Sequence, residues 1–115
     1  MITLDSSSTE IQNIIIFPVR DQVLYTATTD YYVFRCLNKE TLLIKDFLVD
    51  DDSANRLVYQ QFPVRLTGGT ENLDNAVVDL RPIGYWEFKL YPATGATTSD
   101  IVESQLLSSG FLRVI

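Results

Sequence analysis

The most regular pattern in this chain is the alternation of side chains over residues 85–91, where every second residue is large and apolar. Side chains of a β-strand point alternately to its two faces, so the apolar ones share a face. Pro82 and Gly84 precede the segment and indicate a tight turn. We therefore expect a half-buried strand entered through a corner, with Trp86 as the main core anchor beside Phe88 and Leu90.

Further short apolar segments, separated by polar turns, predict more strands at residues 14–17, 23–26 (the weakest), 31–37, 41–49, 57–66, 76–80 and 111–115. Residues 99–107 suit either a short helix capped by Asp100 or a loop with Leu106 and Leu107 packed under it. No apolar stripe is long enough for an α/β fold. We predict an all-β chain, an antiparallel β-sandwich of about seven to eight strands.

Length and composition limit the remaining choices. The chain has 115 residues, of which 46% are hydrophobic and 21% charged, as expected for one globular domain spanning residues 1–115. Residues 1–10 read as a polar N-terminal leader. The net charge of −6 repels phosphates, so we expect no nucleic-acid binding. The longest apolar run, residues 14–17, is too short to cross a membrane.

The residue types argue against catalysis, cofactors and metals. The chain contains no histidine and a single cysteine, which excludes Ser–His and Cys–His arrangements, His-ligated metal and an internal disulfide. Cys36 alternates with Tyr32 and Phe34 and so predicts a small buried side chain rather than a nucleophile. We expect no enzyme, and a small hydrolase is the least supported interpretation.

Two motifs resemble ligand sites only superficially. Asp50, Asp51 and Asp52 offer oxygen ligands for calcium, but the glycine and glutamate of an EF-hand loop do not follow. A solvated turn is the better interpretation of this charge run. The Thr-Gly-Gly-Thr sequence at 67–70 lacks the lysine of a phosphate loop and indicates a turn.

The segment from Leu80 to Trp86 resembles the E–F corner of immunoglobulin-like and fibronectin type III domains. In that corner a leucine and a proline–glycine turn precede an aromatic residue that anchors the turn. By its spacing from Leu80, Trp86 stands where those families usually carry a tyrosine. An indole donates a hydrogen bond only through its N–H, so the hydroxyl bond of that corner is not carried over.

The layout of the whole chain is similar to that of small β-sandwich virion proteins of tailed bacteriophages. The similarity rests on the polar leader, the aromatic strand at 31–35, the strand at 84–91, and Gly110 before a final apolar strand. It implies a non-enzymatic virion protein made in the host cytoplasm: a capsid-associated auxiliary or decoration protein, or a neck or baseplate component. It would act in many copies, binding capsid, portal or tail proteins. The alternative is a carbohydrate- or peptide-binding immunoglobulin-like adhesion module.

Two groups of residues are candidate interface positions. Residues 14–17 and 111–115 are apolar on both faces, which indicates that a neighbouring subunit, or the other terminal strand, covers the second face. This nominates Ile15, Phe17, Phe111 and Ile115. Tyr85 and Tyr91 fall opposite Trp86, where exposed tyrosines suit a protein interface or sugar stacking, or only reflect the strand preference of tyrosine.

Overall fold

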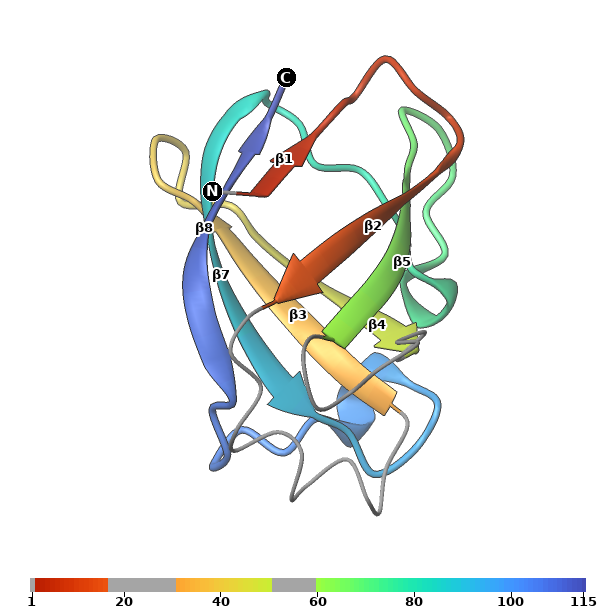
Figure 1. Cartoon of the computed structure of the whole chain (residues 1–115), viewed down its shortest axis with the longest axis vertical. Coiled ribbons are helices and arrows are strands. Elements are labelled where there is room, and N and C mark those ends of the chain that lie inside the picture. The colour runs from red at the N-terminus through yellow and green to blue at the C-terminus, as the bar shows by residue number, and fades with distance from the viewer. Residues whose placement is uncertain (1, 17–30, 51–59) are drawn as a thin grey trace.

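The computed structural model describes residues 2–16, 31–50 and 60–115, and in these ranges the chain forms two β-sheets and no α-helix (Figure 1). Two single 3₁₀ turns, η1 (Leu73–Asn75) and η2 (Thr98–Asp100), lie in the connections between strands. The strands are β1 (Ile2–Leu4), β2 (Ile11–Ile16), β3 (Tyr31–Asn38), β4 (Ile44–Asp50), β5 (Gln60–Leu66), β6 (Val77–Val78), β7 (Gly84–Pro92) and β8 (Ser108–Val114).

The two sheets pack face to face around one core, so the fold is all-β and sandwich-like, as predicted at that level. One sheet has the order β1-β8-β7-β3-β4 and the other the order β2-β5-β6. A wholly antiparallel arrangement was the wrong prediction, because β1 runs parallel to β8 and β6 runs parallel to β5. Neither parallel pair is a hairpin: long stretches of chain join the partners and allow them the same direction.

The N-terminal segment is more than a polar leader. Ile2 and Leu4 lie in β1, which pairs with β8, and Leu4 is buried in the core. The Ile115 N–H donates to the Leu4 carbonyl at 2.9 Å, and the Ser6 N–H donates to the Ile115 carbonyl at 2.8 Å. The segment expected to be a polar leader before the first strand thus itself contains a strand, at Ile2–Leu4. The strand predicted at 23–26, and the first part of that at 57–66, lie outside the described residues.

The core follows the predicted alternation. Trp86, Phe88 and Leu90 of β7 are buried, and so are the inward residues of the neighbouring strands. Phe34 stands at the centre, with ring centroids 5.5 Å from Phe47, 5.4 Å from Phe62 and 5.7 Å from Phe88. These contacts join both sheets, because Phe62 belongs to β5 and the other rings to the five-stranded sheet.

The corner before β7 is closed by the tryptophan. The Trp86 indole N–H donates to the Pro82 carbonyl at 3.1 Å, four residues upstream. The turn also contains a cis Arg81–Pro82 bond and Gly84 at a φ of 125°, a conformation that side chains rarely allow. The single N–H donor of the indole thus makes a side-chain-to-backbone bond across this corner.

The helical alternative for residues 99–107 is wrong. Only the single turn η2 forms. The Thr97 N–H and hydroxyl donate to the Asp100 carboxylate at 3.3 and 2.9 Å, and the backbone is already extended at Ile101. The chain then passes the outer face of the five-stranded sheet, where Ile101 packs against Val33, Leu48 and Ala93. It rejoins the sheet beside β7, where the Leu107 N–H donates to the Leu90 carbonyl at 2.9 Å. Leu107 packs against the core, as the loop alternative expected, whereas Leu106 is exposed.

Candidate functional site

The predicted row of exposed tyrosines is only half present. Tyr85 is 52% exposed, but Tyr91 is 8% exposed, so its placement on a solvent face was wrong. The cause is a small second core on the outer side of the sheet, formed by Val33, Leu48 and Ala93 with Ile101 packed against them. Tyr91 lies directly opposite Val33 in the β3–β7 register and is buried with it.

Arg35 fixes this covered half of the sheet. Its guanidinium bonds Asp46 and Glu103, both at 2.9 Å, and lies 5.7 Å from the centre of the Tyr91 ring. The hydrogen bonds to Asp46, more than those to Glu103, raise the pKa of Arg35 and keep it charged. Because Glu103 belongs to the returning segment, this cluster holds that segment over Tyr91 and has a structural role.

The uncovered half of the same sheet presents an aromatic surface. Phe111 and Tyr85 are 51% and 52% exposed, and the Arg113 guanidinium lies 5.9 Å from the centre of the Tyr85 ring. Arg113 is directly opposite Tyr85 in the β7–β8 register, and Phe111 lies two pairs along, opposite Glu87, so it shares the same face. We call Tyr85, Phe111 and Arg113 the aromatic face.

The row that contains Phe111 continues across the sheet. Glu87 lies opposite Leu37, and Leu37 lies opposite Ile44, whose side chain is 59% exposed. The prediction from sequence named Phe111 and Tyr85 but missed Arg113 and Ile44. The alternation of side chains along β8 and β4 could have identified them, because it places Arg113 and Ile44 on the face that points away from the core.

The charges around the aromatic face are uneven. Lys39 bonds Glu87 at 3.3 Å and is neutralised. Among the described residues, neither Arg113 of the aromatic face nor Lys89, which lies opposite Arg35 on the same outer side of the sheet, forms an ion pair. In a chain of net charge −6, an outer face with two uncompensated cations is suited to a partner surface that carries carboxylates.

The β2 strand shows ordinary alternation rather than burial on both faces. Ile14 and Ile16 are buried, whereas Ile15 is 41% and Ile11 is 58% exposed. Ile15 therefore lies on the outer surface, as an interface residue must, and Phe17 lies outside the described residues. Ile115 is also half exposed, but β1 already pairs with β8, so the final strand does not offer the open edge that we expected.

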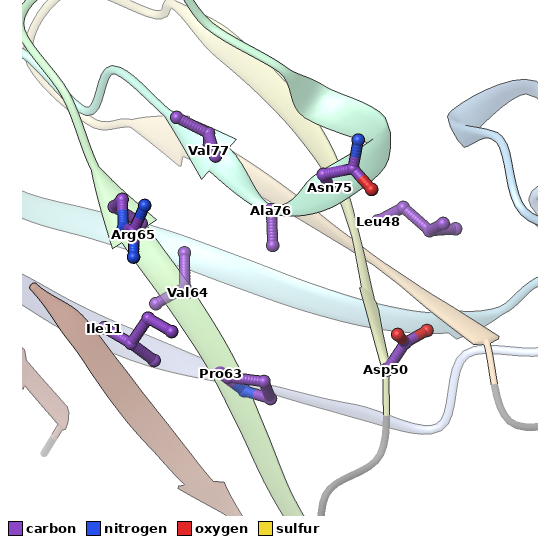
Figure 2. A pocket seen from close by; sticks show the side chains of 9 residues that line it. All are labelled: Ile11, Leu48, Asp50, Pro63, Val64, Arg65, Asn75, Ala76 and Val77. Atoms are coloured by element: carbon purple, nitrogen blue, oxygen red, sulfur yellow. The ribbon is translucent and has the colours of Figure 1, made fainter.

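A hollow of about 330 Å³ lies between β4, β5 and the η1–β6 segment (Figure 2). Its lining is mostly apolar, and Figure 2 shows Arg65 and Asp50 on opposite sides of it. Asn75 adds an amide, and the apolar lining residues are Ile11, Leu48, Pro63, Val64, Ala76 and Val77. No second carboxylate lines the described part of the hollow, so it presents no pair of acids for hydrolysis.

The other candidate chemical groups are accounted for by packing. Cys36 is fully buried, and this burial raises the pKa of its thiol, which keeps it protonated and unreactive. In the part of the chain that the structure describes, no three His, Cys, Asp or Glu side chains group to hold a metal ion. Asp50 is exposed, and the rest of the predicted Asp50–Asp52 turn lies outside that part.

Comparison of the chain with protein-family models, with curated proteins and with solved structures found no match. Within the described ranges, no helix has the length and apolarity that a membrane crossing requires.

Proposed function

We propose that this chain is a non-enzymatic structural protein that binds other proteins in a repeated assembly, with the virion of a tailed bacteriophage as its setting. The phage setting rests on the resemblance in chain layout. We further propose that its sandwich is immunoglobulin-like. The support for this is the corner in which Trp86 bonds the Pro82 carbonyl, after Leu80 and before an aromatic strand.

The observation that carries the proposal is the aromatic face. Tyrosine, phenylalanine and arginine are enriched at protein interfaces, where large side chains of low flexibility contribute most of the binding energy. Tyr85 and Phe111 each expose about half of a large side chain to water. They lie on a part of the sheet that no other described segment covers. Arg113 stacked over Tyr85 restricts both side chains before binding and so lowers the entropy cost of association.

A carbohydrate-binding module is the second candidate, and Tyr85 is the observation in its favour. An exposed ring can stack on a sugar, but Arg113 already occupies one face of this ring. The second ring that sugar binding would use, Tyr91, is buried. The geometry therefore favours a protein partner. Reproducible binding of one sugar class on a glycan array, lost in Tyr85→Ala, would reverse that preference.

The direct test is co-sedimentation of the purified chain with capsid, portal and tail proteins encoded beside its gene. We expect the wild type to bind one of them and the double variant Tyr85→Ser, Phe111→Ser to bind at least about tenfold more weakly, since exposed aromatic anchors dominate such interfaces. Leu106→Ser is the matched control, because Leu106 is an equally exposed apolar residue elsewhere. Wild-type protein that binds none of these components would overturn the proposal.

A further inference from the structure

The β2 strand is the outer strand of the three-stranded sheet, and no described strand pairs with its other side (Figure 1). The other outer strands are short or covered. β1 has three residues and β6 has two. β4 is covered by the segment that contains η1, which Glu71 anchors through its bond to Lys45 at 2.8 Å. β2 has six residues and is the long open edge of the described structure.

The backbone direction of β5 shows which groups of β2 face that edge. The Arg65 N–H donates to the Ala76 carbonyl at 2.8 Å, and the Thr67 N–H donates to the Val78 carbonyl at 3.0 Å. Both bonds run toward the β6 side. Successive residues of a strand direct their N–H and C=O groups to opposite sides. The even-numbered residues of β5 therefore face β2.

The register then assigns the groups of β2. Gln12 and Ile14 lie opposite even-numbered residues of β5, so their backbone N–H and C=O groups hydrogen-bond to β5. Ile11, Asn13 and Ile15 consequently direct their N–H and C=O groups to the open edge. The same three side chains are exposed on the outer face of the sheet.

The chemistry of this edge favours a second copy of the chain. Proteins usually protect an open edge with lysine, proline or a bulge, and β2 has none of these. Its six residues carry no charge, although the chain as a whole carries −6. Two copies of an acidic protein repel each other least where the surfaces that meet are uncharged.

We propose that β2 pairs antiparallel with β2 of a second copy, around a two-fold axis beside Asn13. This register places Ile11 opposite Ile15 of the second copy and the two Asn13 amides opposite each other. Moving the axis to Ile14 would instead set Asn13 against Ile15, a worse match of polar with apolar. The pairing joins the two three-stranded sheets into one. It rests on the proposed function, for which it supplies the contact between copies.

A cysteine at the axis tests the register. Hydrogen-bonded antiparallel pairs have Cα atoms about 5.5 Å apart, which suits a disulfide. We expect Asn13→Cys to form a covalent dimer under mild oxidation, seen as a doubled mass on non-reducing gels. Ser109→Cys, exposed on the other sheet, is the control. Buried Cys36 does not interfere. Asn13→Cys that cross-links no faster than Ser109→Cys would overturn the proposal.

Two further variants test the pairing by light scattering after size exclusion. Asn13→Pro removes an N–H that faces the open edge and leaves the ladder to β5 intact, so we expect a monomer. Ile15→Lys places a charge in the proposed contact and, at an exposed position, should still fold. We expect it to weaken the dimer at least about tenfold. A wild-type monomer, or a folded Ile15→Lys variant that dimerises normally, would overturn the pairing.

The failure of this inference is distinguishable from that of the proposed function. If the wild type binds a virion component through the aromatic face but shows no β2 pairing, only the pairing is wrong. If it binds no virion component, the proposed function fails whatever the β2 variants show.

Discussion

Replacing Trp86 tests the corner on which the sandwich depends. The side chain is fully buried and is the largest in the core. Removing it in Trp86→Ala should cost about 3–5 kcal/mol from lost packing and the cavity left behind. Trp86→Phe keeps most of the ring contact but removes the N–H that bonds Pro82, so we expect about 1–3 kcal/mol. Against a total stability of about 5–15 kcal/mol, the first change should unfold much of the protein.

The measurement is urea unfolding followed by far-ultraviolet circular dichroism, because the chain has only one tryptophan and its fluorescence disappears with the mutation. Tyr85→Ala is the matched control: it removes the neighbouring aromatic residue, which is half exposed, and should cost less than about 1 kcal/mol. If Trp86→Ala is destabilised no more than Tyr85→Ala, the assignment of Trp86 as the core anchor of this corner is refuted.

Three further outcomes are expected. Burial raises the pKa of Glu71, but hydrogen bonds from Lys45 and from the Asp79 backbone N–H outweigh it and lower the pKa below the ordinary 4.5. The ionised carboxylate therefore stabilises the fold above pH 4.5, and this stabilisation is lost as the pH falls below that value. On such acidification the melting temperature of the wild type should fall more than that of Lys45→Met. Gly110→Ala should destabilise by about 1–3 kcal/mol in a thermal melt, because the new Cβ would lie 3.1 Å from the Phe88 ring, which is buried against Phe34 and has little room to move. Elemental analysis of purified protein should find no stoichiometric metal, and one bound equivalent of calcium or a transition metal would contradict this.

The faces of the strands were predictable because they depend on local alternation. Trp86, Phe88 and Leu90 were correctly placed in the core, since a single strand with one polar and one apolar face admits one orientation. Cys36 followed from the same rule through its neighbours in β3. No knowledge of the partner strands was needed for these residues.

Long-range partners account for what the sequence could not show. Tyr91 has the same local pattern as Tyr85 but is buried, because a segment later in the chain returns over it and is held there by Arg35 and Glu103. The pairing of β1 with β8 joins the two ends of the described chain. The alternation at Ile2 and Leu4 is too short to predict a strand from the sequence.

The run of isoleucines at Ile14, Ile15 and Ile16 shows where local reasoning reaches its limit. By composition it suggested burial on both faces, whereas its register with β5 buries the first and third and leaves the second in water. The same register determines which backbone groups are already used within the sheet. Ile15 is exposed, and its backbone N–H and C=O groups point to the open edge of the sheet. One added strand could bond these groups and bury the side chain at the same time, which is not possible at a buried isoleucine. The proposed assembly surface on β2 thus rests on the pairing of β2 with β5, which the sequence alone left ambiguous.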